Sequence, residues 1–250
     1  MPEYSTPFGA DPLGAGSLAV APDFNQCLQY FRAIGLGPES IAEVRALGVQ
    51  PNPRWRSHIE SGYFDDPECA AREATRISTV ASGVYATLNE ITPALLARRK
   101  NRLGIAEQGS LTTAGDVVRR RRVCFDIDPV RPKGVSATAG ERDEARKVAG
   151  KVIVWIREVC GQDPWIIDTG NGYHLYYGVD LPSADGDRVK ALLQAAHSLH
   201  SSSAAVVDTT DFDPARIVRV PGTLNRKGDS TPDRPHRLVR VVSGPGGGAC

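Results

Sequence analysis

The sequence lacks the features that mark membrane, secreted and disulfide-stabilised proteins. It has no apolar run long enough to cross a membrane and no pattern of the secretory-signal type. Its five cysteines are scattered, and no two of them form a Cys-x-x-Cys pair. This spacing argues against a zinc knuckle and against a disulfide framework, and it is typical of a reducing compartment. We therefore expect a cytoplasmic protein without a membrane partner.

The chain also has almost no net charge. Thirty Lys and Arg residues balance 29 Asp and Glu residues, so the formal net charge is +1. A basic field over the whole molecule is thereby excluded, and any affinity for nucleic acid must come from local patches. The remaining composition, 41% hydrophobic and 24% charged over 250 residues, is that of a globular protein with one substantial core or two small ones.

Both ends of the sequence differ from its middle. Residues 1–22 are rich in Gly, Pro, Ser and Ala without a period, which predicts a disordered segment. Residues 244–250 resemble a linker, so we expect a further domain to follow, for which a helicase is a candidate. Between these ends we predict an α+β unit over residues 23–243, with a small α/β module at about 23–115 and a second module at about 116–243.

Hydrophobic periodicity and capping residues predict the elements of both modules. In the first module we expect helices at 24–34, 66–77 and 92–99, and strands at 41–47, 55–59 and 83–89. In the second we expect strands at 122–128, 165–169, 173–179, 204–208 and 236–242, and helices at 141–160 and from a Ser183 cap to about 200. The order β-α-β-β-α-β predicts a split βαβ unit, as in RNA-recognition modules.

Two aspartates end the first strand of the second module. Alternation along a strand places Asp126 and Asp128 on one face, opposite Phe125 and Ile127. Pro129 then ends the strand and leaves the pair at its rim. Two neighbouring carboxylates repel each other, and a hard divalent cation such as Mg²⁺ or Mn²⁺ is a natural partner for them. A solvated strand end is the alternative.

A glycine-containing hairpin follows in the same module. Asn171-Gly172 predicts a tight turn between two strands, and Gly170 and Gly172 would let backbone N–H groups approach an anion. Thr169 precedes this turn and His174 opens the return strand. A plain hairpin with a histidine beside it is the alternative.

The strand at 204–208 also ends in an aspartate. In a split βαβ sheet this strand lies near the first one, so Asp208 is expected to join the Asp126–Asp128 pair. Three carboxylates can hold two metal ions, the arrangement that serves phosphoryl transfer. Asp211 and Asp213 are alternatives for the third position.

Several basic residues are candidates for binding phosphate. Arg216 and Arg219 have helical spacing, and Lys227 lies beyond a Pro-Gly turn. Guanidinium groups bind phosphate oxygens with two parallel hydrogen bonds, and lysine supplies a point charge. A solvated basic face is the alternative, but because these three residues follow three candidate metal ligands, they are interpreted as triphosphate ligands. Other basic clusters could follow a phosphodiester backbone, namely Arg98, Arg99 and Arg102, and Arg119 to Arg122.

Taken in order, these segments resemble the archaeo-eukaryotic primase (AEP) superfamily, specifically the primase-polymerases of plasmids, phages and other mobile elements. The resemblance rests on Asp126-Ile127-Asp128, on the hairpin from Thr169 to His174, on Val207-Asp208, and on the segment 214–225; it covers about residues 25–242. The segments 61–66 and 83–89 resemble the N-terminal module of the same proteins. A zinc-binding insertion, which some relatives use to initiate primers, is missing from the sequence.

The resemblance implies a fold, an activity and a set of site residues. It implies an N-terminal α/β module packed on an RNA-recognition-like module, with the active cleft between them. It implies DNA primase-polymerase activity with single-stranded DNA template, primer and nucleoside triphosphates, and two Mg²⁺ or Mn²⁺ ions. The ions would be held by Asp126, Asp128 and Asp208, and the incoming nucleotide by Thr169, Gly170, Gly172, His174, Arg216, Arg219, Lys227 and Asn89.

Two other functions fit part of the sequence. A nucleotide-sugar transferase also uses Asp-x-Asp to hold a metal ion and a diphosphate, but this class leaves Asp208 and the Arg216–Arg219 pair without a role. A non-catalytic module that binds single-stranded nucleic acid would present aromatic residues on its sheet face. Tyr173, Tyr176 and Tyr177 are the candidates for such a surface.

Overall fold

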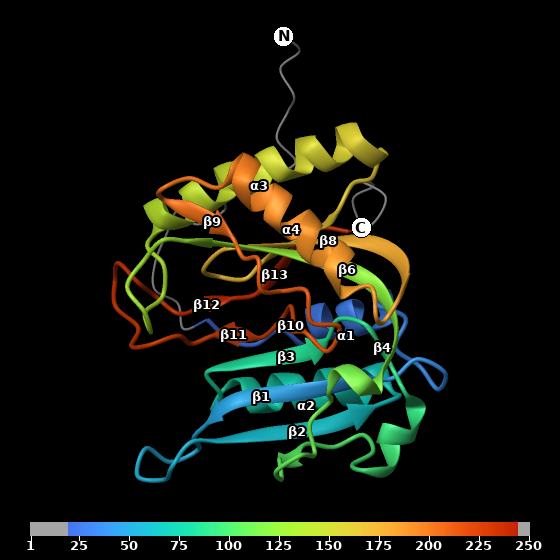
Figure 1. Cartoon of the computed structure of the whole chain (residues 1–250). Helices are drawn as coiled ribbons and strands as arrows, with labels where there is room; N and C mark the ends of the chain where they lie inside the picture. Colours follow the sequence, from blue (N-terminus) through green and yellow to red (C-terminus); the bar gives the residue numbers. More distant parts are fainter. Residues whose placement is uncertain (1–19, 245–250) are drawn as a thin grey trace.

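The computed structural model describes residues 20–244 and shows two large antiparallel sheets and a two-stranded sheet, which is formed by β11 (Leu224–Asn225) and β12 (Arg237–Leu238) (Figure 1). The mixed α+β class predicted from the sequence is confirmed. Most of the segment predicted to be disordered, and all but the first residue of the linker expected at 244–250, lie outside the described residues. Within the described part, no helix is both long and apolar enough to cross a membrane.

The first sheet is built mainly from the N-terminal half of the chain. Its strand order is β10-β3-β1-β2-β5, all antiparallel. Two helices, α1 (Phe24–Ala33) and α2 (Pro67–Ser78), pack against each other, and α2 packs on the sheet. Helix α2 begins where predicted, because the Asp66 side chain accepts hydrogen bonds from the Glu68 and Cys69 amides. The strands are β1 (Ala42–Val49), β2 (His58–Phe64), β3 (Gly83–Thr87), β5 (Gly104–Ile105) and β10 (Ile217–Arg219).

The second sheet has the split βαβ topology predicted from the sequence. The order β9-β6-β8-β7 places the first and last strands of the β-α-β-β-α-β unit side by side, and β13 and β4 extend the sheet at β7 and β6. Helices α3 (Ala139–Cys160) and α4 (Gly186–His200) cover one face (Figure 1). The strands are β4 (Glu90–Ile91), β6 (Val117–Pro129), β7 (Trp165–Asp168), β8 (Tyr173–Pro182), β9 (Ala205–Val207) and β13 (Arg240–Ser243).

Strand β6 contributes to two separate cores. Phe125 and Ile127 pack with α3 and α4, whereas Cys124 on the opposite face packs with α1, α2 and the first sheet. The predicted alternation along this strand is therefore correct. After β9 the chain crosses back, and β10 pairs with β3 of the first sheet. This crossing places the segment that contains Arg216 and Arg219 against the polar face of β6.

Several predicted element boundaries are wrong. Strand β6 begins at Val117 and not at residue 122, so Arg119, Arg120 and Arg121 lie inside the strand and not before it. The strand expected at 55–59 runs over 58–64, and the helix expected at 92–99 is a short 3₁₀ helix, η1 (Pro93–Ala97). The strand expected at 236–242 is divided into β12 (Arg237–Leu238) and β13.

The start of α4 also differs from the prediction. The helix begins three residues beyond Ser183 with Asp185 at the N-cap position, and no side chain caps it. Strand β8 continues to Pro182, and the backbone carbonyl of Ser183 accepts a hydrogen bond from Arg120 in β6. A buried arginine from a neighbouring strand therefore fixes this turn.

Candidate functional site

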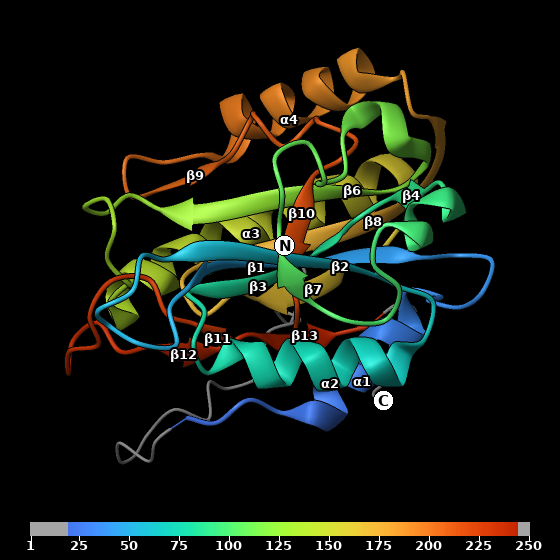
Figure 2. The same ribbon diagram turned by 90° about the horizontal axis from the view of Figure 1, so that it is seen from below.

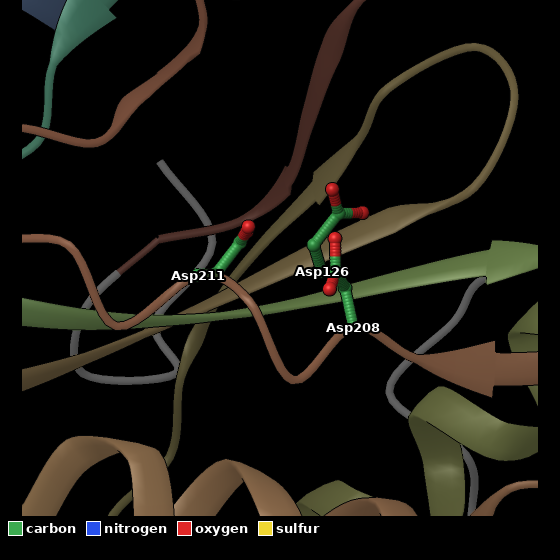
Figure 3. A group of neighbouring side chains, drawn as sticks. All are labelled: Asp126, Asp208 and Asp211. Carbon is green, nitrogen blue, oxygen red and sulfur yellow. The ribbon is translucent and has the colours of Figure 1, made fainter. Parts of the chain in front are cut away.

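Three aspartates meet above the polar face of β6. Asp126 lies on β6, and Asp208 follows β9, where the Asp208 amide donates to the Asp126 carbonyl at 2.8 Å. Asp211 lies in the loop that leads to β10. One carboxylate oxygen from each residue lies within 4.8 Å of the other two (Figure 3). The expected association of Asp126 with Asp208 thus follows from the pairing of β9 with β6, and Asp211, an alternative from the sequence, completes the group.

Asp128 lies near this group but outside it. Its side chain is 43% exposed and forms an ion pair with Arg131, Nη1 to Oδ1, at 3.3 Å. Burial and the Asp126 charge raise the pKa of Asp128. The sequence thus predicts the correct face for Asp128 but misses its partner, which lies only three residues further along the chain.

Burial and charge act differently on the clustered carboxyls. Burial disfavours ionisation of Asp126, but His174, Arg216 and Arg219 together hold its pKa below the usual value. For Asp211, burial and repulsion from Asp126 raise the pKa to about 8, although the Arg216 guanidinium lies 2.6 Å away. An added positive charge would favour the ionised form of all these groups, which is the behaviour of a cation site.

The hairpin from Thr169 to His174 is longer than predicted. Strand pairing ends at Asp168 and Tyr173, so four residues form the turn, and of these only Gly170 has a positive φ, at +82°. Gly172 is required for a different reason. A Cβ atom on it would lie 2.2 Å from the Ile127 carbonyl oxygen, between the two aspartates of β6. The turn therefore packs directly against the Asp-x-Asp segment.

The expected anion cradle of backbone amides is not formed in this turn. The Gly170 amide donates to Asp168 at 2.8 Å, and the amides of Asn171 and Gly172 donate to Thr169 Oγ1. These donors stabilise the turn itself. The cations around the site are therefore better placed than these amides to bind an anion.

His174 faces Asp126 across the β6–β8 pair. The two residues are register partners, and His174 Nε2 lies 3.5 Å from Asp126 Oδ1. His174 Nδ1 lies 3.1 Å from the Tyr176 hydroxyl, which fixes the ring. The sequence identified His174 as a candidate site residue but did not predict its close contact with Asp126.

The predicted phosphate ligands share one cavity with Asp126 and Asp128. Arg216 Nη2 lies 2.6 Å from Asp211 and 3.7 Å from Asp126, so this side chain bridges two carboxylates. The Arg219 guanidinium lies 4.8 Å above the Tyr85 ring, and its buried Nη1 forms no hydrogen bond in the described residues. Burial and the Arg131 charge lower the pKa of Lys227.

This cavity of about 160 Å³ lies between the two sheets. The helical spacing seen in the sequence does not apply, because Arg219 lies on strand β10 and Arg216 directly precedes it. Both side chains nevertheless reach the cavity. The lining residues are Tyr85, Asp126, Asp128, Arg131, Thr169, Asn171, His174, Arg216, Ile217, Arg219, Asn225 and Lys227.

Sequence reasoning missed Arg131, Tyr85 and Asn225. Arg131 is nearly buried and donates to the Pro129 and Val135 carbonyls as well as to Asp128. Asn225 donates to the Thr169 carbonyl and so connects the end of the basic segment to the hairpin. Its place in the Pro-Gly-Thr-Leu-Asn stretch was a usable signal; Tyr85 gave none, because only its strand pairing with Arg219 brings it to the cavity.

Asn89 has a different environment from the one predicted. It is buried outside the cavity, where it donates to the Pro214 carbonyl and accepts from the Arg121 and Arg122 amides. All these partners are protein backbone, so the structure gives Asn89 a role in joining the segment before β10 to β6.

The basic clusters are also distributed differently. Arg98 and Arg99 line a second cavity of about 280 Å³, but their guanidinium groups donate to backbone carbonyls, and Arg102 is exposed. In β6, Arg120 is buried on carbonyls of Ser183 and Phe212. The other three arginines of β6 have protein partners as well: Arg119 and Arg121 pair with Asp180, and Arg122 lies 5.8 Å from the Trp165 ring.

The aromatic surface expected of a non-catalytic nucleic-acid-binding module is not present on this sheet. Tyr173, Tyr176 and Tyr177 are all buried. Tyr176 packs in the core between the sheets, and Tyr177 packs edge-on against Phe125 beneath the helices. Stacking of bases on these rings is therefore excluded in this conformation.

Comparisons with known proteins match the fold and not the sequence. No family model and no curated protein matches this chain. The AEP domain of a primase-polymerase from cyanophage S-2L is similar, with a TM-score of 0.49 and 14% identity over 91% of this chain and 93% of that one. The primase RepB′ (TM-score 0.43, 14% identity) aligns with 88% of this chain and 56% of its own.

A third similar structure is the polymerase domain of ligase D from Mycobacterium tuberculosis in complex with DNA. It has a TM-score of 0.45 and 17% identity, covering 86% of this chain and 79% of that one. All three are primases or polymerases by name. Identities and TM-scores of this size transfer no residue role to this chain.

Proposed function

We propose that this chain is a DNA primase-polymerase of the AEP superfamily that adds nucleotides to a primer in the order set by a single-stranded template. One observation carries the proposal. Carboxylates and cations line the same cavity: Asp126 and Asp128 lie there with Arg216, Arg219 and Lys227, and Asp126 also belongs to the group with Asp208 and Asp211. Carboxylate oxygens suit hard divalent cations, and the arginines and lysine suit a triphosphate.

The donor set fits the metal ions that the resemblance implies. Asp126 and Asp208 belong both to the predicted set and to the observed group, in which Asp211 is the third member. Asp128 lines the same cavity as a further oxygen ligand. When bound, two Mg²⁺ or Mn²⁺ ions would lower the pKa of the attacking 3′ hydroxyl and stabilise the pyrophosphate that leaves.

Arg216 and Arg131 have a part in nucleotide binding that follows from their present contacts. Arg216 binds Asp126 and Asp211, and Arg131 binds Asp128. Both guanidinium groups thus occupy carboxylates that a cation site needs. On binding of nucleotide they exchange these carboxylates for phosphate oxygens, so that buried charge stays paired throughout.

Arg219 and His174 complete the nucleotide site. The Nη1 of Arg219 is buried without a hydrogen bond in the described residues, which leaves a donor for a phosphate oxygen. The ring of His174 holds Asp126 in place through its 3.5 Å contact and is itself fixed by Tyr176.

The experiment that tests the proposal is incorporation of a labelled nucleotide on circular single-stranded DNA, without a primer and with one, in Mg²⁺ or Mn²⁺. The wild-type chain is expected to extend the primed template, and the Asp126→Asn and Asp208→Asn variants are expected to lose at least 100-fold in rate, since each removes a charge that holds the ions. Asp187→Asn, an exposed aspartate on α4, is the matched control and keeps full activity.

The same assay separates the alternatives. Incorporation that follows the template sequence identifies a polymerase, and product on the unprimed circle as well identifies a primase. A nucleotide-sugar transferase would be active with sugar nucleotides and without template. No incorporation on either template by a folded wild-type chain, in both metals, would refute the proposal. A helicase partner remains a prediction from the sequence.

A further inference from the structure

The hairpin between β1 and β2 carries an exposed tryptophan between two arginines. Its tip is the segment 50–57, Gln-Pro-Asn-Pro-Arg-Trp-Arg-Ser, which contains no acidic residue. Trp55 is 61% exposed, whereas Trp165 is buried and Trp155 is half-buried. Tryptophan is mostly buried in folded proteins, so an exposed one flanked by charge of a single sign indicates a binding surface.

The tip is held in one conformation by its own hydrogen bonds. The Gln50 side-chain amide donates to the carbonyls of Pro53 and Trp55, at 3.2 Å and 2.7 Å. The Trp55 amide donates to the Asn52 carbonyl at 2.9 Å, and the Arg54 amide to the Asn52 side chain at 2.9 Å. Two prolines further restrict the backbone. The indole is thus presented outward by an ordered loop, which lowers the entropy lost on binding.

Both arginines of the tip are free to bind an anion. Arg54 and Arg56 are exposed, and neither forms an ion pair or a side-chain hydrogen bond within residues 20–244. The exposed arginines of β6 differ, because Arg119 and Arg121 are paired with Asp180. The tip therefore combines an aromatic face with two unneutralised guanidinium groups.

The base of this hairpin adjoins the cavity that holds the aspartates. Leu47 of β1 pairs with Gly83 of β3, and the Arg219 guanidinium fills the space where a Cβ on Gly83 would lie. In Figure 2, β1 ends on the same side of the molecule as β6, whose final residues carry the carboxylates. The tip thus projects beyond the cavity on the side where the catalytic strand ends.

We infer that the β1–β2 tip is a contact surface for the single-stranded nucleic acid that enters or leaves the cavity, with Trp55 stacking on a base and Arg54 and Arg56 binding adjacent phosphates. Base–aromatic stacking requires no particular nucleotide sequence, because every base offers a π face, and the two phosphate contacts fix the position of the nucleic acid on the surface. Such a surface would hold a template whatever base reaches it at each step of synthesis. The inference rests on the proposed function only where it calls the bound nucleic acid a template. Binding of single-stranded nucleic acid to the tip does not depend on that function.

The test is the affinity for a fluorescently labelled oligothymidine of about 20 nucleotides, measured by anisotropy at several salt concentrations. Trp55→Ala is expected to weaken binding by roughly 5- to 100-fold, and Trp55→Phe, which keeps a stacking ring, to recover most of that loss. Arg54→Ala/Arg56→Ala is expected to lower the slope of log affinity against log salt by about 1.4, since two phosphate contacts are removed.

Matched controls come from the far side of the molecule. Leu199→Ala on α4 removes a side chain that is 62% exposed, and Arg188→Ala removes an exposed arginine from the same helix. Both are expected to leave affinity and salt slope unchanged. The Trp55 side chain fills no core space, so its variants should keep the wild-type melting temperature, and intrinsic fluorescence of the wild type should be quenched by the oligonucleotide.

Failure of this inference is distinguishable from failure of the proposed function. If Trp55→Ala and the double arginine variant bind the oligonucleotide as the wild type does, the surface is refuted while template-dependent incorporation can persist. If they lose binding but the wild type incorporates no nucleotide, the surface stands and the catalytic proposal falls. A Trp55→Ala variant that keeps its affinity but no longer self-associates in sedimentation would assign the tip to a second copy of the chain and overturn the inference.

Discussion

The contact between Gly172 of the hairpin and strand β6 gives a specific prediction for Gly172→Ala. A Cβ atom at this position would lie 2.2 Å from the Ile127 carbonyl oxygen and 2.8 Å from Asp128 Oδ1. An ordinary contact needs about 3.4 Å, so the turn and β6 must separate by about 1 Å. The Ile127 carbonyl oxygen belongs to the backbone of a sheet strand, so a change of side-chain rotamer cannot remove the clash.

The loss of folding stability caused by Gly172→Ala can be estimated from the known effects of overpacking. Adding one carbon to a well-packed position costs about 1–3 kcal/mol. In a chain of this size each kcal/mol lowers the melting temperature by about 2–4 °C, so we expect a fall of about 2–12 °C. The displacement falls between Asp126 and Asp128, and a shift of about 1 Å in a catalytic group can cost about 100-fold in rate. Activity should therefore fall by a larger factor than the stability change alone explains.

Gly178→Ala is the matched control for this prediction. Gly178 lies on the same strand, β8, and a Cβ atom there would meet nothing within 4 Å. Because the Gly178→Ala substitution makes the unfolded chain less flexible, it should leave the free energy of unfolding unchanged or slightly raised. Thermal unfolding and primed-template extension are measured on both variants. If Gly172→Ala melts and extends like Gly178→Ala, the close packing of the hairpin on β6 does not constrain the site.

Two further predictions concern buried carboxyl groups. Glu43 is fully buried, and although burial opposes its ionisation, Arg45, Thr112 and Ser61 hold its pKa below the usual value. The stability it contributes is therefore present above its unfolded pKa of about 4.3 and is lost as the pH falls through the lower folded value. Glu43→Gln should lower the free energy of unfolding in urea by about 1–3 kcal/mol at pH 7, with a difference that shrinks below about pH 4; a constant difference would contradict this account. The pKa of Asp211 is raised to about 8, so the metal-free chain binds more protons folded than unfolded and should lose stability between about pH 4 and pH 8. Asp211→Asn should flatten this slope in EDTA, and an unchanged slope would show that Asp211 titrates normally.

The strand-end aspartates could be predicted from the sequence because their positions follow from local rules. Alternation fixes the face of Asp126 and Asp128, and the β-α-β-β-α-β order fixes β9 as the neighbour of β6, which brings in Asp208. Helix α2 was predicted to begin after Asp66 for the same reason, since a cap acts over three residues. These predictions needed no knowledge of how the two sheets pack.

Other features could not be predicted because they depend on contacts between distant segments. The sequence predicts that Arg120 belongs to a basic cluster, yet its side chain is buried and donates to carbonyls in the loops before α4 and β10. Asn89 was predicted to contact the incoming nucleotide, but its side chain joins backbone groups of Pro214 and Arg121. Tyr85 has no signal in its own sequence and reaches the cavity only because β10 pairs with β3.

The sequence by itself determined the hydrophobic periodicity of the helices and strands, the positions of turns and helix caps, and the aspartates at the strand ends. Each of these features depends on residues that are only a few positions apart in the chain. The tertiary structure alone decided which charges oppose each other. The return of the chain after β9 into the first sheet places Arg216 between Asp126 and Asp211. It also buries Asp211 near Asp126, and burial and the Asp126 charge raise the pKa of Asp211 despite the nearby Arg216. Coulomb interactions and burial depend on distance through space, and only the packed fold sets those distances.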